Sequence, residues 1–304
     1  MNPINIQIAA DISNHFIGYE LFLATYNKLK SVKNQRIVFD FSNNKRLEAN
    51  LCAIFGALIE MIQSNNNTFE FKNVSNSLYQ LFDRNGFLAL LDKAQIFEPH
   101  INMLTYQKYK PNDDGIFKDY IAKQLLLKPD FPQHSEKLGK KIIESIFEIY
   151  ENARTHGKCN YIHVCGQYFP EKEDKPLHIT IVDRGNSIRK NVNDYYKNNF
   201  QEFKTISGKN AIEWAMYIGN TTKIGVPGGL GLNIIFEFVK LNKGKIQIIS
   251  SNGFWEYNDG KITLKTFQHA FVGTIVNIKF NLNDKNRYYL TEEQTENFSL
   301  DDLF

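Results

Sequence analysis

The chain contains 304 residues, 42% of them hydrophobic, and carries a formal net charge of +3 at pH 7. This composition can bury a substantial core and excludes global disorder, and the nearly balanced charge gives no support for a dedicated nucleic-acid binder. The length predicts about two domains. Five acidic residues and no bases lie in residues 288–304, so the rest of the chain carries a net charge of +8. We interpret the acidic end as a tail.

The number of cysteines and the absence of long apolar segments predict the cellular compartment. Cys52, Cys159 and Cys165 are too few and too irregularly spaced for a disulfide framework. The N-terminal residues lack the basic segment and the long apolar core of a secretory signal. No stretch approaches the ~20 apolar residues that a membrane helix needs. We therefore expect a cytoplasmic protein that has no membrane attachment.

The first part of the chain alternates between strand-like and helix-like patterns. Strands are expected at residues 5–9, 36–41 and 68–71, and helices at residues 9–28, 51–62 and 74–82. Such an alternation predicts a small α/β domain over residues 1–99. Residues 100–134 contain turn and breaker signals, and we interpret them as a connecting segment.

The second part is expected to form another α/β domain over residues 135–283. A long helix begins after Ser135, a good N-cap residue, and runs to about His156. Strands follow at 160–168 and 177–182, and a polar, asparagine-rich stretch at 186–199 shows no element. The remaining expected elements are helices at 208–218 and 231–240 and strands at 245–250, 261–267 and 273–281. Residues 284–304 complete the chain as the acidic tail.

Three pieces of the second part could carry chemistry. Glu148 and Asn152 lie four residues apart on the long helix and so share a face, where a carboxylate and an amide could serve a Mg²⁺-bound phosphate. Asp183 ends an apolar strand and could accept a hydrogen bond from an exocyclic amine. A glycine-rich segment, residues 225–231, precedes a helix, where backbone N–H groups can approach phosphates. Taken singly, these pieces are also typical of a polar helix face, an Asx turn and a flexible loop.

Together and in this order, the pieces resemble the GHKL ATP-binding superfamily, which includes gyrase-type, chaperone, mismatch-repair and histidine-kinase ATPases. The resemblance covers residues 115–282 and implies a Bergerat α/β sandwich. The N box of the family resembles Glu148–His156, its first glycine box Asp183–Ile188, its second glycine box Gly229–Leu232, and its closing strand Phe271–Val276.

The resemblance implies that the chain binds ATP and Mg²⁺ and assigns roles to its residues. Glu148 would be the general base, Asn152 the Mg²⁺ ligand and Asp183 the acceptor for adenine. Residues 189–228 would form the ATP lid. The residues implied to contact the nucleotide are Asp183, Gly185, Lys223, Gly228, Gly229, Leu230, Gly231, Leu232 and Thr274. Lys223 is equally well interpreted as a solvated lysine.

One position departs from the family pattern. The first glycine box of the family usually reads Asp-x-Gly-x-Gly, whereas Ser187 stands in place of the second glycine here. Because the Cβ of serine penalises positive φ, we expect a less permissive turn at this point.

Residues 1–99 resemble a STAS domain, the fold of anti-sigma factor antagonists, over Ile37–Ser42, Phe69–Ser75 and Leu81–Phe87. Antagonists of that family carry a phosphorylatable serine at the start of a helix. The corresponding stretch here is Glu48-Ala49-Asn50, which has no hydroxyl. Ser42 is the nearest hydroxyl and is interpreted first as a turn residue.

These observations lead to a regulatory protein in which a GHKL ATPase or serine-protein-kinase-like domain controls contacts with a partner protein through a STAS-like module. The phosphoryl group would pass to water or to a protein hydroxyl. Two alternatives stay open. One is a nucleotide-gated binding module with little or no turnover, and the other is a clamp in which ATP drives formation of a homodimer.

Overall fold

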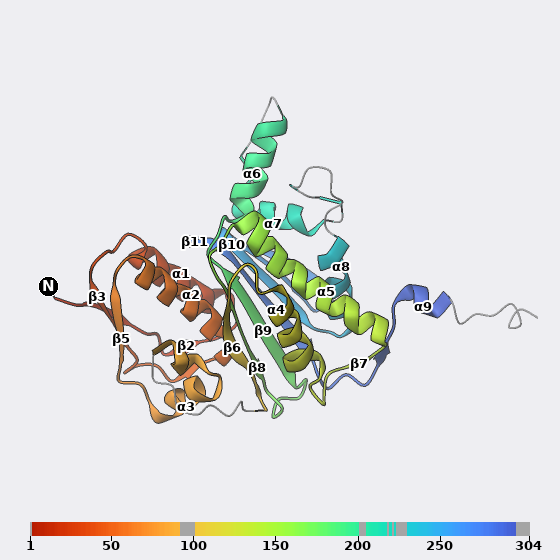
Figure 1. Cartoon of the computed structure of the whole chain (residues 1–304), viewed down its shortest axis with the longest axis horizontal. Helices are drawn as coiled ribbons and strands as arrows, with labels where there is room; N and C mark the ends of the chain where they lie inside the picture. The colour runs from red at the N-terminus through yellow and green to blue at the C-terminus, as the bar shows by residue number, and fades with distance from the viewer. Residues whose placement is uncertain are drawn as a thin grey trace, which may run out of the picture.

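The computed structural model describes residues 2–91, 101–200, 205–217, 219–220, 222 and 230–295, and the chain has an α/β architecture built on two main sheets (Figure 1). We call residues 2–91 the N-terminal unit and residues 101–295 the C-terminal unit. In the described residues, no helix is long and apolar enough to cross a membrane.

The N-terminal unit contains a parallel sheet in the order β1-β3-β5. Its strands are β1 (Ile4–Gln7), β3 (Arg36–Asp40) and β5 (Thr68–Lys72), and its helices are α1 (Phe16–Leu29), α2 (Cys52–Ser64) and α3 (Asn76–Arg84). The short strands β2 (Asp11–Ile12) and β4 (Arg46–Leu47) pair beside the 3-10 turn Ala49–Leu51 that leads into α2. A second 3-10 turn, Phe87–Leu91, follows α3.

The C-terminal unit contains an antiparallel sheet in the order β10-β11-β9-β8-β6. Its strands are β6 (Met103–Tyr109), β8 (Ile162–Tyr168), β9 (Pro176–Asp183), β10 (Lys245–Asn258) and β11 (Lys261–Asn281). Its longer helices are α4 (Asp114–Ile121), α5 (Glu136–Asn152), α6 (Ile188–Asn199), α7 (Gly208–Met216) and α8 (Leu230–Leu241).

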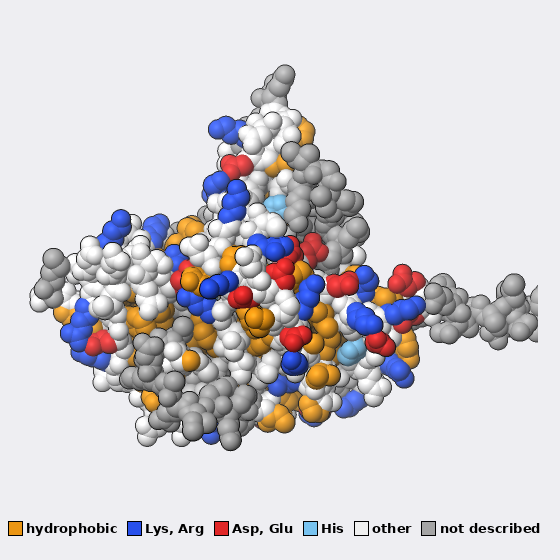
Figure 2. Space-filling view, viewed as in Figure 1, with side chains coloured by type: hydrophobic (Ala, Val, Ile, Leu, Met, Phe, Trp, Pro, Cys, Tyr) orange, Lys and Arg blue, Asp and Glu red, His pale blue; other side chains and the backbone are white. Residues whose placement is uncertain are grey.

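The two faces of the five-stranded sheet are covered by different parts of the chain. Helices α1 and α2 lie between the two sheets, whereas α4 and α5 lie on the other side of the five-stranded sheet (Figure 1). Phe55 of α2 therefore shares a core with Val182 of β9 and Ile275 of β11. Ile146 of α5 shares the opposite core with Ile179 of β9. The face drawn in Figure 2 mixes both signs of charge, in keeping with the small net charge.

The segment 100–134, interpreted above as a connection, supplies the edge strand β6 and the helix α4. Its strand pattern was hard to recognise because the pairing of β6 with β8 shifts between Leu104 and Gln107. That irregularity breaks the alternation of buried side chains on which a strand prediction depends. A π turn, Ala122–Leu126, follows α4.

The acidic tail expected from residue 284 onward contains regular structure in its first part. Strand β12 (Arg287–Tyr288) pairs with β7 (Gln133–His134), and a short helix α9 (Thr291–Thr295) follows. The Tyr288 ring packs against Phe238 of α8 at 5.1 Å between ring centres, and the Ser135 hydroxyl donates to Glu293 at 2.6 Å. Residues 296–304 lie outside the described residues.

The strands expected at 245–250, 261–267 and 273–281 form one long hairpin, in which β10 and β11 stay paired through register shifts between Ser250 and Gly253. The stretch 186–199, for which no element was expected, contains α6. Its polar composition hid the helix, since within α6 only Val192 is fully buried. Helix α6 projects away from the body of the molecule (Figure 1).

The close approach of α2 to β6 depends on Gly56. A Cβ at this position would lie 2.3 Å from the hydroxyl of Tyr106, and Tyr106 cannot easily turn away because it is buried and bonded to His163. We therefore expect Gly56→Ala to lower the free energy of unfolding by about 1–3 kcal/mol, measured by urea denaturation. Gly115→Ala in α4 is the matched control, since its Cβ would meet no atom within 4 Å. An unchanged or raised stability of Gly56→Ala would contradict this packing.

Candidate functional site

A cavity of about 170 Å³ lies between α5, α6, α7 and the five-stranded sheet. Four of the residues singled out from the sequence line it, although they come from three separate elements. They are Glu148 and Asn152 of α5, Asp183 at the end of β9 and Thr274 of β11. Asp183 and Thr274 are directly paired across the two strands. The cavity is therefore the candidate functional site.

Helix α5 presents Glu148 and Asn152 to the cavity because its other face is buried. The Ser135 hydroxyl accepts a hydrogen bond from the Leu138 N–H at 3.1 Å, so the expected N-cap starts the helix. Ile146 and Tyr150 are fully buried on the apolar stripe. Glu148 and Asn152 are half-buried, so their polar groups can still meet a ligand that enters the cavity.

The end of α5 widens into a π turn, Ala153–Gly157, at the edge of the cavity. Single π turns of this kind occur frequently at functional sites. The turn places His156 in the cavity lining, with its Nδ1 atom 3.1 Å from the Thr222 hydroxyl. Sequence reasoning assigned no role to His156, although it stands at the end of the motif that carries Glu148.

Asp183 is the most deeply buried charged group of the site. Its side chain is 5% exposed, and its Oδ1 atom accepts a hydrogen bond from the Gly185 N–H at 2.8 Å. Burial raises the pKa of Asp183 to about 7, and the negative charge of Glu60 adds to the rise. Backbone N–H groups of Gly185 and Thr274 act in the opposite direction. A carboxyl group in a cavity whose pKa lies near 7 is typical of a functional site.

Glycines allow the backbone to pack closely around Asp183. A Cβ on Gly157 would lie 3.1 Å from Asp183 Oδ1, and a Cβ on Gly185 would lie 2.1 Å from the Gly157 carbonyl oxygen. Gly273 has a φ of +104°, a conformation that side chains other than glycine rarely adopt. Gly185 therefore does not line the cavity itself but allows the turn after Asp183 to pack closely against the π turn.

Ser187 does not strain this turn, contrary to our expectation from the missing second glycine. Its backbone has φ −69° and ψ 154°, which serine adopts easily. Its hydroxyl accepts a hydrogen bond from the Lys190 N–H at 3.2 Å and so caps α6. Ser187, the residue that departs from the family pattern, therefore serves as the N-cap of α6.

The expected phosphate segment can be placed only in part. Lys223, Gly228 and Gly229 lie outside the described residues. Leu230, Gly231 and Leu232 form the first turn of α8. Ile235, further along the same helix, lines the cavity.

The apolar walls of the cavity were not recognised from the sequence. Ile246, Ile248, Val276 and Ile278 of β10 and β11 line it, together with Ile188 and Val192 of α6 and Ile212, Trp214 and Met216 of α7. The alternation of apolar residues in these strands was the available signal. Apolar walls around one buried carboxyl group suit a flat ring that carries an amine.

Asn152 brings an amide oxygen, a ligand type suited to a hard cation, into the cavity lining next to Glu148. Mg²⁺ commonly takes one or two protein ligands and completes its coordination with water and substrate phosphates. The Asn152 amide oxygen fits that role beside the Glu148 carboxylate. Within the described residues there is no group of three or more His, Cys, Asp and Glu side chains that could hold a metal ion.

The sequence matches no protein-family model, and a search of curated proteins finds no significant match.

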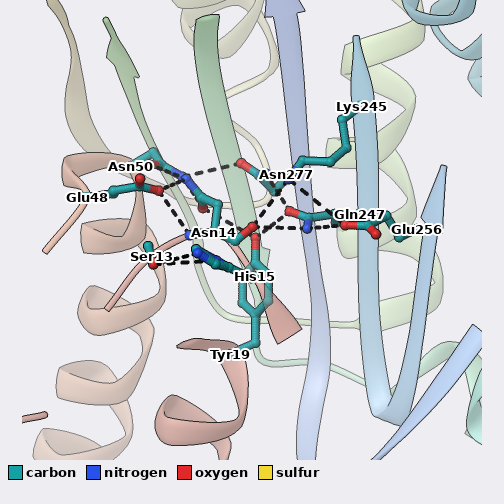
Figure 3. A network of polar contacts seen from close by, with 10 residues as sticks. All are labelled: Ser13, Asn14, His15, Tyr19, Glu48, Asn50, Lys245, Gln247, Glu256 and Asn277. Atoms are coloured by element: carbon teal, nitrogen blue, oxygen red, sulfur yellow. Dashed lines mark hydrogen bonds and ion pairs between the residues drawn. The ribbon is translucent and has the colours of Figure 1, made fainter. Parts of the chain in front are cut away.

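The stretch Glu48-Ala49-Asn50 does not lie at the surface. Glu48 is 6% exposed and Asn50 is fully buried, and both belong to a polar network against the five-stranded sheet (Figure 3). Asn50 donates to Thr180 of β9 at 2.7 Å, and the Ala49 N–H donates to Gln167 of β8. Ser42, the nearest hydroxyl considered, lies in an Asx turn in which its N–H bonds Asp40 at 2.9 Å.

The raised pKa of Asp183 predicts a pH-dependent stability. Between its ordinary value of 3.8 and about 7, the folded chain retains a proton that the unfolded chain has released, so stability falls as pH rises. We expect this group to cost about 2–3 kcal/mol of unfolding free energy between pH 5 and pH 8.

Asp183→Asn removes the titration and should flatten the pH dependence by that amount, as measured by urea unfolding at both pH values. Asp194→Asn on the exposed side of α6 is the matched control and should retain the full dependence. Parallel pH profiles for the wild type and Asp183→Asn would contradict a raised pKa.

Proposed function

We propose that the chain binds ATP and Mg²⁺ in the cavity and turns ATP over there, as a member of the GHKL superfamily. The observation that carries the proposal is the placement of Asp183. Its buried carboxyl group lies at one side of an apolar cavity, and Glu148 and Asn152 line the same cavity. One hydrogen-bond acceptor for a base, apolar surfaces for its ring and oxygen ligands for a cation are the groups that an adenine nucleotide requires.

The arrangement of elements supports the same proposal. The family fold is an α/β sandwich whose sheet is covered by helices on the nucleotide side, and here α5, α7 and the cavity share one face of the β10-β11-β9-β8-β6 sheet. The N-terminal unit, a parallel sheet with helices, supports the assignment of a STAS-like module. We propose that this module governs contacts with a regulatory partner protein.

The proposed chemistry uses three residues in separate roles. Asp183 accepts a hydrogen bond from the exocyclic amine of adenine and thereby orients the base. Glu148 accepts a proton from the attacking water as the new P–O bond forms at the γ-phosphorus and the bond to the β–γ bridging oxygen breaks. Asn152 would hold Mg²⁺, which neutralises the charge of the phosphates when it is bound.

The burial of Glu48-Ala49-Asn50 favours a particular version of this function. A STAS-like antagonist receives the phosphoryl group at this place, but here the stretch has no hydroxyl and lies against the sheet. We therefore propose that water or a hydroxyl on another protein accepts the phosphoryl group. The same observation is also consistent with a second candidate function, a nucleotide-gated binding module without turnover.

Purified full-length chain should release labelled phosphate from γ-labelled ATP in the presence of Mg²⁺. Glu148→Ala should lower that rate by about 10²–10⁴-fold, because a general base contributes that much, and should leave ATP affinity nearly unchanged. Glu151→Ala is the matched control, since Glu151 pairs with Arg154 and is not part of the cavity lining.

The outcomes separate the candidates. ATP binding with no turnover in the wild type, even with Mg²⁺ present, would support the binding module instead. Absence of any ATP binding, measured by calorimetry at millimolar nucleotide, would refute both.

A further inference from the structure

Asp183 and Arg184 serve opposite faces of the five-stranded sheet. Successive side chains of a strand point to opposite sides, and β9 ends at Asp183. Asp183 therefore lines the cavity, whereas Arg184 reaches the other face and meets Glu60 of α2, with 3.3 Å between Nη1 and Oε1. Two adjacent residues thus connect the candidate site with the N-terminal unit.

Glu60 is buried and has its charge partners inside the protein. It is 7% exposed, and its Oε2 atom lies 2.8 Å from His163 Nε2. Burial lowers the pKa of His163, so this imidazole is neutral at pH 7. Its Nε2–H must then donate to the Glu60 carboxylate, and its Nδ1 accepts from the Tyr106 hydroxyl at 2.7 Å. Arg184 is therefore the cation that balances Glu60.

The backbone around Arg184 is packed too tightly to move independently of Asp183. A Cβ on Gly273 would lie 2.0 Å from the Asp183 carbonyl oxygen and 2.8 Å from the Arg184 Cα atom. On the other side, Gly185 abuts the Gly157 carbonyl group. Since close-packed groups transmit displacement to their neighbours, a shift of Arg184 must displace the Asp183 carboxyl group.

We infer that the Glu60–Arg184 ion pair is a positioning device through which the N-terminal unit sets nucleotide affinity at the site on the other face of the sheet. This inference rests on the proposed function for its ligand, ATP. Glu60 and Arg184 touch no substrate; they act through the turn that holds Asp183.

The negative charge of Glu60 raises the pKa of Asp183, and a positive charge such as that of Arg184 is expected to act in the opposite direction. The titratable and charged groups around Asp183 are Glu60 from α2, Cys159 before β8, Glu148 and His156 from α5 and its π turn, and Arg184 itself. Removing the negative charge of Glu60 lowers the pKa of Asp183, and removing the positive charge of Arg184 raises it. A purely structural defect would not shift the titration in opposite directions.

The experiment uses full-length Glu60→Gln, Arg184→Met and the double variant, with Glu70→Gln as control because Glu70 forms a surface ion pair with Arg36 in the same unit. Mg²⁺–ATP affinity is measured by calorimetry from pH 5.5 to pH 8.5. At pH 8.5 each single variant should bind about tenfold more weakly, within the usual range of coupling between sites. The midpoint of the pH dependence should move down in Glu60→Gln and up in Arg184→Met.

A second readout does not need the nucleotide. Hydrogen–deuterium exchange of the peptide covering residues 183–188 should accelerate in both single variants and not in Glu70→Gln. The affinity losses of the single variants should not add in the double variant, because both remove the same ion pair.

Each result decides one question. If the wild type binds ATP, while the single variants keep its affinity, pH midpoint and exchange rates, the positioning role is wrong and the proposed function stands. If the wild type fails to bind ATP, the proposed function fails. In that case the exchange data test the ion pair alone. Faster exchange in the single variants supports its role in positioning the turn, and unchanged exchange refutes that role.

Discussion

The structure depends on a strand, β9, that is buried on both of its faces. All eight residues from Pro176 to Asp183 are buried, and the aliphatic side chains of the strand are divided between two cores. Ile179 and Ile181 face the helices that line the cavity, whereas Val182 faces α1 and α2. The alternation continues one residue past the end of the strand. The side chain of Asp183 therefore lines the cavity, and that of Arg184 reaches Glu60 on the other face.

The contact between the two units is specified by polar groups set within an apolar surface. Asn50 of the N-terminal unit bonds Thr180. Tyr19 bonds Gln247, which also accepts from Asn277 (Figure 3). A buried polar group that loses its partner costs about 1–3 kcal/mol, so a rotated or shifted placement of α1 and α2 on the sheet would leave several such groups unsatisfied. The network therefore fixes one register of the N-terminal unit on the sheet.

Sequence reasoning located the elements whose patterns are local. The cap at Ser135 and the apolar stripe of α5 were sufficient to find that helix and to place Glu148 and Asn152 on one face. Helix α6 was not predicted because its residues are mostly polar, and because its cap, Ser187, was interpreted as a missing glycine and not as a cap. The pair formed by Glu60 and Arg184 escaped for a different reason. Each looks like a solvated surface charge in sequence, and only the packing of α2 on the five-stranded sheet buries Glu60 and brings Arg184 to it.

The N-terminal unit and the candidate site are connected through the packed turn after Asp183, so the proposed binding of a nucleotide would act on both. The turn after Asp183 is confined by Gly273 on one side and Gly157 on the other, so ligand-induced displacement has to pass to Arg184. Coupling between two sites is reciprocal in free energy. Under the proposed function, a partner that displaces Glu60 would alter nucleotide affinity at the cavity, and the nucleotide would alter affinity for that partner by the same factor. The stretch Glu48-Ala49-Asn50 has no hydroxyl and is buried, so a partner would act on this coupling by binding elsewhere on the N-terminal unit and not by phosphorylation of that stretch.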